Sequence, residues 1–283
     1  MGDCIFCGQP AGFLRRKHKE CEEQEQQRQR MREAGRAQIT AEALGAISGT
    51  KDFVELESSI NGIATAASIP ESEKIDTLVQ AWESAVERSL DDSLLDRSEE
   101  QRLVDFSQQF ALAQIDLDKR GAFTKVRKAA LLRDILHGVL PPPVPLPDNL
   151  AINLQKSEQL VWSFTDVEYL EDRTRRQYVG GSQGVSVRIM KGVYYRVGAF
   201  KGHPVEYTER TRVDSGWVLV TNKHIYFSGA AKSLRIPYTK IITFIPFENG
   251  FGIMRDAATA KPQIFVIEDG WFAYNLVTNL ARL

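Results

Sequence analysis

The sequence predicts an α+β, multidomain protein in which a small cysteine-containing knuckle precedes a helical bundle and an antiparallel β domain with a C-terminal helix. Three observations lead to this prediction. All three cysteines lie within the first 21 of the 283 residues. Apolar residues recur every three or four positions between about residues 40 and 138, which is typical of helices. Beyond about residue 150 they alternate with polar residues, which is typical of strands.

The overall composition is that of an ordinary folded protein. Hydrophobic residues make up 43% of the chain and charged residues 26%, and 36 basic against 37 acidic residues leave a formal net charge of −1. This balance gives no bulk indication of a nucleic-acid-binding protein. No apolar run approaches the roughly 18 residues that span a bilayer, and no apolar signal region begins the chain. We therefore expect a cytoplasmic protein without a transmembrane segment.

The first 21 residues carry the pattern C-x2-C, ten residues, H-x2-C, formed by Cys4, Cys7, His18 and Cys21. Paired soft or borderline ligands at this spacing complete a tetrahedron around Zn²⁺. Because four protein ligands leave no open position for water or substrate, we expect a structural zinc ion. A segment this short cannot bury a core, so the metal would supply most of its folding free energy. Three unrelated thiols, or one disulfide with a thiol left over, are the alternatives.

Nucleic-acid contact is a second interpretation of this knuckle, since zinc knuckles often bind nucleic acid. The ring of Phe13 could stack on a base. Residues 20–36 weaken this interpretation, because they mix Glu, Gln and Arg instead of forming a basic arm. The basic residues beside the ligands are Arg15, Arg16, Lys17 and Lys19.

The middle segment is predicted to be a small helical bundle. Residues 20–38, which precede it, have almost no apolar face and indicate a solvated helix or helical linker. Serines are the expected N-caps of two helices, Ser68 with Glu71 and Ser98 with Gln101 three residues on. The four predicted helices cover 52–66, the segment after Ser68, the segment after Ser98, and 124–137 with Gly138 as the C-cap.

The run Pro-Pro-Pro-Val-Pro-Leu-Pro at 141–147 predicts a stiff spacer. The clearest β unit follows at 217–227, where two strand-like halves flank Asn222 and Lys223, a predicted hairpin turn. Other strands are predicted at 157–164, 185–189, 192–197, 241–247, 251–255 and 263–267, followed by a helix from Trp271 to about Leu280. The predicted division is 1–38 (knuckle and helical linker), 39–140 (helical domain), 141–149 (Pro-rich linker) and 150–283 (β domain).

From Gly216 to Phe227 the chain has a glycine, an apolar strand, Thr-Asn-Lys and a second strand that ends in Phe. The next strand carries an Ile-Pro pair, Ile236 and Pro237. In these features the segment resembles bacterial PH-like or GRAM-like domains, over roughly residues 155–283. The resemblance implies a PH-like antiparallel β-barrel with a C-terminal helix, acting as a binding module for protein or, as in some relatives, for a membrane surface.

No phosphate-binding loop, no nucleophile with an adjacent base and no metal site with an open position is visible in the sequence. We therefore expect a non-enzymatic interaction or scaffold protein, and the alternative is a nucleic-acid-binding protein that uses the knuckle and the basic segment 173–212. That segment carries nine basic and two acidic residues, whereas residues 71–118 carry 13 acidic and 4 basic ones. A protein partner or self-association through the acidic segment is the favoured expectation. The candidate partner-binding residues are Arg173, Arg175, Arg176, Arg188, Lys191 and Arg196, with Lys201, Arg210 and Arg212 in the same segment.

Overall fold

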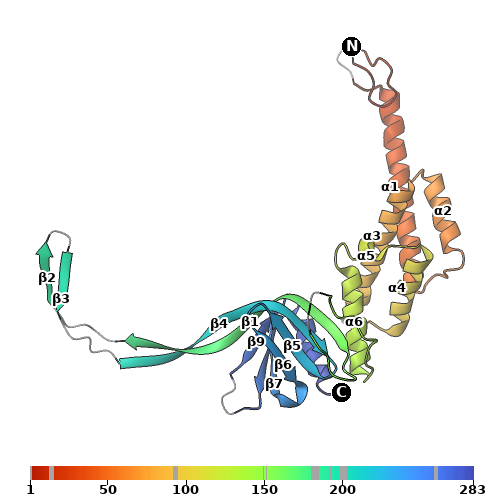
Figure 1. The fold of residues 1–283 in the computed structure, drawn as a ribbon. Coiled ribbons are helices and arrows are strands. Elements are labelled where there is room, and N and C mark those ends of the chain that lie inside the picture. The colour runs from red at the N-terminus through yellow and green to blue at the C-terminus, as the bar shows by residue number, and fades with distance from the viewer. Residues whose placement is uncertain are drawn as a thin grey trace. The chain divides into compact units, whose positions relative to one another are not determined.

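The computed structural model describes residues 2–12, 16–91, 95–148, 150, 152–179, 185–190, 193–197, 203–257 and 261–283, with the backbone alone between residues 173 and 208. The chain divides into two compact units, Met1–Asp134 and Ile135–Leu283. The first contains the knuckle and a set of helices, and the second contains the strands and the last helix (Figure 1).

The first unit confirms the predicted helical segment. Its core gathers around Trp82, whose indole Nε1 donates a hydrogen bond to the carbonyl oxygen of Leu103 at 3.0 Å, and around the fully buried ring of Phe106. The amphipathic spacing of the sequence accounts for this core, because one face of each longer helix is apolar. The helices are α1 (Lys19–Ile47), α2 (Leu56–Ala66), α3 (Glu71–Ser89), α4 (Arg97–Gln109), α5 (Gln114–Leu117) and α6 (Ala122–Leu136).

Helix α1 has two different halves. Residues 19–34, which we call the stalk, contain no buried side chain, as the lack of an apolar face predicts. From Gly35 onward the helix enters the core, and a Cβ at Gly35 would lie 2.5 Å from the Cβ of Ala67. One continuous helix therefore crosses the domain boundary predicted after residue 38 and joins the knuckle to the bundle (Figure 1).

The two predicted serine caps are wrong. Helix α3 begins after Pro70, and Ser68 has a left-handed φ of 53° instead of capping it. Helix α4 is capped by Asp96, whose carboxylate accepts from the backbone N–H groups of Ser98 and Glu99 at 2.6 and 2.8 Å. The capping box is thus Asp96 with Glu99, because a charged carboxylate is a stronger acceptor for helix N–H groups than a serine hydroxyl. The predicted C-cap Gly138 is left-handed, with φ 77°, and follows α6.

The second unit is built on a seven-stranded antiparallel sheet in the order β6-β5-β4-β1-β9-β8-β7. The predicted hairpin is confirmed, since β4 and β5 pair on either side of Asn222 and Lys223. The strands are β1 (Leu160–Val179), β4 (His203–Thr221), β5 (His224–Gly229), β6 (Ser233–Pro237), β7 (Ile241–Phe247), β8 (Gly250–Arg255) and β9 (Gln263–Val266); β2 (Val185–Met190) and β3 (Val193–Val197) form a separate two-stranded sheet.

The sheet is not closed into a barrel, which corrects the expected architecture. Strands β6 and β7 remain its two edges, and a short 3-10 turn, Tyr238–Lys240, leads from one to the other. The last helix, α7 (Gly270–Leu280), packs against β7 and β8. Its Leu276 and Leu280 are buried, as predicted. Because α7 covers apolar residues of the sheet, the unit gains a core without strand closure.

Strands β1 and β4 are far longer than the short strands predicted. Their register runs to Val179 opposite His203, although β9 pairs with β1 only up to Glu171 and β5 pairs with β4 only from Gly216. Residues 172–179 and 203–210 therefore form a two-stranded ribbon, the hairpin arm, that extends from the sheet (Figure 1).

The proline-rich run does not extend freely as a spacer. Val144 donates a backbone hydrogen bond to the carbonyl oxygen of Leu160 at 2.9 Å. Leu219 and Tyr226 of the sheet belong to the same apolar cluster as Leu160. The side chains from residues 144–154 that pack on this cluster are Val144, Leu146, Leu150, Ile152 and Leu154.

Candidate metal centre

Two tight turns and one helix start bring the four predicted ligands together. Between Cys4 and Cys7 the chain reverses, and the N–H of Gly8 donates to the carbonyl oxygen of Cys4 at 2.8 Å. Gly8 has a left-handed φ of 71°, which a residue with a Cβ rarely adopts. His18 occupies the N-cap position of α1 and Cys21 lies in its first turn. The H-x2-C half of the motif is therefore held by helical geometry.

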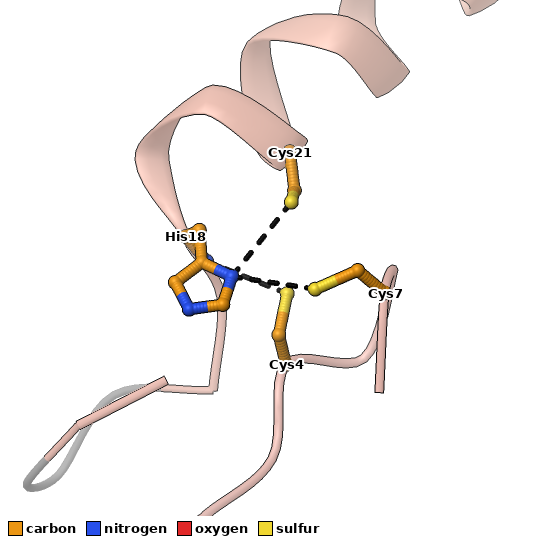
Figure 2. A group of neighbouring side chains, drawn as sticks. All are labelled: Cys4, Cys7, His18 and Cys21. Atoms are coloured by element: carbon orange, nitrogen blue, oxygen red, sulfur yellow. Dashed lines mark hydrogen bonds between the residues drawn. The ribbon is translucent and has the colours of Figure 1, made fainter. Parts of the chain in front are cut away.

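Figure 2 shows the four side chains turned toward one another. Their ligand atoms all lie within 4.8 Å of one another. His18 Nδ1 is 3.4 Å from Cys7 Sγ and 3.7 Å from Cys21 Sγ. In tetrahedral zinc sites the Zn–S and Zn–N bonds are about 2.3 and 2.05 Å, which places sulfur and nitrogen about 3.6 Å apart. The cluster has dimensions that could hold a metal ion such as zinc.

The second ring nitrogen of His18 supports the same conclusion. His18 Nε2 lies 3.1 Å from the carbonyl oxygen of Pro10. A carbonyl oxygen can only accept, so Nε2 carries the proton and Nδ1 presents its lone pair to the thiols. Metal-bound histidines in proteins usually have such a second hydrogen bond, which fixes the tautomer and the ring orientation. The four ligand atoms and the hydrogen bond that orients the His18 ring thus both suit a metal ion.

The thiols are perturbed in opposite directions. Burial raises the pKa of the Cys4 thiol, but hydrogen bonds from the backbone N–H groups of His18, Cys7 and Phe6 outweigh it and lower this pKa to about 6. Burial, together with the neighbouring Cys7 and Cys4 thiols, raises the pKa of Cys21 to about 11. Several thiolates facing one another repel, and a divalent cation between them would remove that penalty.

The surface around the cluster exposes apolar side chains, and two of its lysines form ion pairs with glutamates of α1. Ile5 and Phe6, between the first two cysteines, are 64% and 36% exposed. Lys17 Nζ is 3.1 Å from Glu22 and also lies over the Phe6 ring, while Lys19 Nζ is 3.8 Å from Glu23. Two of the basic neighbours are thus partly neutralised by α1. Phe13 and Arg15 lie outside the described residues.

The candidate residues of the basic segment lie on the hairpin arm and on the two-stranded sheet. Arg173, Arg175 and Arg176 are on β1 and Arg188 and Arg196 are on β2 and β3, all outside the part of the chain with described side chains; Lys191 and Lys201 lie outside the described residues altogether. At the base of the arm, Arg210 contacts Asp172 at 3.5 Å and Arg212 contacts Glu168 at 3.0 Å. The register also places Arg173 opposite Glu209 and Arg176 opposite Glu206. Strand pairing therefore sets acidic residues against part of this basic segment, and its role in partner binding stays a prediction.

A buried polar cluster in the second unit was missed by sequence reasoning. The Glu158 carboxylate accepts hydrogen bonds from Thr221 Oγ1 at 2.6 Å, from Tyr226 Oη at 2.9 Å and from the backbone N–H of Gln155 at 2.8 Å. His224 Nδ1 lies 2.8 Å from the same carboxylate. We call Glu158, Thr221, His224 and Tyr226 the Glu158 cluster. It ties the turn before β1 to the β4–β5 hairpin.

Ionisation in this cluster follows from its hydrogen bonds. Burial raises the pKa of Glu158, but the hydrogen bonds from Thr221, Gln155, His224 and Tyr226 outweigh burial and lower it overall. Burial and the hydrogen bond to Glu158 raise the pKa of Tyr226 to about 12. The carboxylate accepts hydrogen bonds from four donors, so the cluster stabilises the fold.

Comparisons with protein-family models, with curated proteins and with solved structures found no match for this chain. Within the described residues, no helix is long and apolar enough to cross a membrane. The case for function therefore rests on the geometry of the chain itself.

Proposed function

We propose that this protein is a non-enzymatic interaction protein in which a structural zinc ion, bound by Cys4, Cys7, His18 and Cys21, folds an N-terminal binding knuckle. The single observation that supports it is the convergence of four protein ligand atoms within 4.8 Å. Four protein ligands fill a tetrahedral zinc and leave no position for a substrate. The bound ion would neutralise the thiolates and hold the turn that presents Ile5 and Phe6.

The knuckle favours a protein partner over nucleic acid. Ile5 and Phe6 expose apolar surface that the 21-residue module cannot bury. Lys17 and Lys19 contact glutamates of α1, so their charge is less available to phosphates than the sequence suggests. Apolar and aromatic anchors are what protein interfaces use at their centres. The nucleic-acid alternative predicts affinity for DNA or RNA that falls steeply with salt, which a salt titration would detect.

The β unit is proposed as the second binding module of the PH-like or GRAM-like kind. An antiparallel sheet with β1 at its centre, short edge strands and a final helix against β7 and β8 supports this resemblance. The hairpin arm, formed by the far ends of β1 and β4, would carry the candidate partner-binding residues Arg173, Arg175 and Arg176. In this proposal the protein joins two partners, or two copies of itself, and does no chemistry.

Two measurements test the proposal. Elemental analysis of the purified protein should find one zinc per chain, and its absence would refute the structural ion. Quantitative co-purification from the native cells should then show a partner that the Ile5→Ser/Phe6→Ser double variant loses. The matched control is Val54→Ser/Ile115→Ser, which removes two apolar side chains of the bundle that are 84% and 78% exposed. Equal losses in both variants would contradict a binding knuckle.

A further inference from the structure

A hollow of about 290 Å³ lies in the helical unit where three helix ends meet. The C-terminal ends of α1 and α3 and the N-terminal end of α4 form its walls. Leu44 and Ala85 give it an apolar side, and Arg88, Ser89, Glu99 and Arg102 give it a polar side. It is separate from the zinc ligands and plays no part in the function proposed above.

The two arginines that line this hollow differ from other arginines of the unit because they have no hydrogen bond or ion pair with the described residues. Neither Arg88, which is exposed, nor Arg102, which is half-buried, has a hydrogen bond or ion pair with another of the described residues. Other arginines of the same unit are paired: Arg36 contacts Glu73 at 3.2 Å and Arg120 contacts Glu83 at 2.9 Å. Two guanidinium groups therefore border one hollow, and neither has an ion pair with a carboxylate of the described residues.

Arg102 is placed there by the end of helix α1. Its guanidinium lies against Gly49, where any side chain would collide with it. Gly49 has a left-handed φ of 78°, the conformation that favours glycine after a helix. The carbonyl ends of α1 and α3 attract a positive group. Local backbone geometry thus holds a cation at the rim of the hollow.

We propose that this hollow binds phosphate or a small phosphomonoester between Arg88 and Arg102. Guanidinium groups match phosphate oxygens in pairs of parallel hydrogen bonds, and the Ser89 hydroxyl offers a further donor. The N-terminus of α4 is not the binding element, because the N–H groups of Ser98 and Glu99 already donate to Asp96. Glu99 and the carbonyl ends of α1 and α3 oppose an anion, so the two arginines act against these negative groups and the affinity is modest.

An internal carboxylate is the rival occupant. Asp92 follows α3 in the sequence and lies outside the described residues. If its side chain satisfied the two arginines, an external anion would have no site. The experiment therefore includes the variant Asp92→Asn.

Isothermal titration calorimetry of the full-length, zinc-loaded protein tests the proposal, with inorganic phosphate and O-phosphoserine as separate ligands at constant ionic strength. We expect saturable binding that strengthens from pH 5.5 to 7.5, because phosphates gain their second charge near pH 6 whereas guanidinium groups do not titrate. Arg88→Gln, at an exposed position that tolerates substitution, should weaken binding roughly tenfold, as loss of a charge-assisted hydrogen bond predicts. Arg102→Gln should weaken it to a similar degree.

Arg36→Gln is the matched control, since it removes one exposed positive charge of α1 away from the hollow. Saturable binding of either ligand supports the site. The ligand that binds more tightly, inorganic phosphate or O-phosphoserine, identifies the source of the phosphate group. The proposal is overturned if the wild-type protein shows no saturable binding, if only Asp92→Asn binds, or if Arg36→Gln weakens binding as much as Arg88→Gln.

Discussion

The cysteine–histidine cluster and the Glu158 cluster each bring one histidine into contact with polar side chains, but they differ in what they still need to be satisfied. In the first, three thiols and one imidazole bring four ligand atoms within 4.8 Å of one another. In the second, the Glu158 carboxylate already receives donors from Thr221, Tyr226 and Gln155 and contacts His224. A histidine beside an acidic group occurs in both. The balance of donors and acceptors, and not residue identity, separates a candidate metal site from a structural tie.

The largest expected effect is that of metal removal on the first cluster. Zinc binding supplies roughly 10–16 kcal/mol to knuckles of this kind, so chelation or Cys4→Ser should unfold residues 2–18. Hydrogen exchange measured by mass spectrometry should show protection lost there and retained in α3 and β4. Unchanged exchange at the knuckle after complete chelation would mean that the cluster, like the Glu158 cluster, is stable without an ion.

Removal of the carboxylate from the second cluster should cost less but still be severe. Glu158→Ala leaves the Tyr226 hydroxyl and the His224 ring buried without their carboxylate acceptor, whereas the Thr221 hydroxyl can still donate to the carbonyl oxygen of His224 at 2.9 Å. We expect a loss of about 3–5 kcal/mol in the free energy of unfolding of the second unit, as for other broken buried pairs. Urea-dependent hydrogen exchange in β4 and β5 measures it. Chelation should leave the same amides unaffected.

Tyr226→Phe removes one donor and keeps the acceptor. The expected loss is about 1 kcal/mol, the usual net value of one hydrogen bond. The same substitution in the Glu158→Gln background should cost clearly less, because the coupling runs through the carboxylate. Equal costs in both backgrounds would show that the contribution of the Tyr226 hydroxyl does not depend on the Glu158 carboxylate.

The smallest effect is on acid stability. Because the folded-state pKa of Glu158 is lowered, its contribution is fully present above the ordinary glutamate pKa of about 4.3 and is lost as the pH falls through the lower folded value. Between pH 5 and 3 the second unit should therefore lose more stability in the wild type than in Glu158→Gln. Parallel stability curves for the two proteins would contradict an ionised, hydrogen-bonded Glu158.

Local signals in the sequence predicted much of this fold. The spacing of Cys4, Cys7, His18 and Cys21 predicted their convergence, and the polar pair between 217–221 and 224–227 predicted the β4–β5 hairpin. The final helix and the burial of Leu276 were also predicted, since each depends on a pattern within about ten residues. Such patterns act through neighbouring backbone, which is why they can be recognised without tertiary structure.

What the sequence left open depends on distant partners. Glu158 and His224 are separated by 66 positions, so no spacing rule could join them. The arm was missed because its paired residues are up to 38 positions apart, and the acidic residues opposite its arginines were counted as separate charges. One available signal was overlooked: Leu150, Ile152 and Leu154 alternate as a half-buried extended segment does, and they pack on the sheet.

Because of the stalk, residues 19–34 of α1, the metal ion affects how far the knuckle lies from the helical bundle. Its side chains are unburied. Apart from the ion pairs Lys19–Glu23 and Arg28–Glu25 and the hydrogen bond from Arg32 to the carbonyl oxygen of Ser68, this stretch is held as a helix by the knuckle at one end and by the bundle at the other. While both ends are fixed it is a rod of roughly 24 Å, at about 1.5 Å per residue. Without the ion its first turns can fray, and each unwound residue can span about twice that rise. The zinc ion would then set the distance between the helical bundle and the knuckle that carries Ile5 and Phe6.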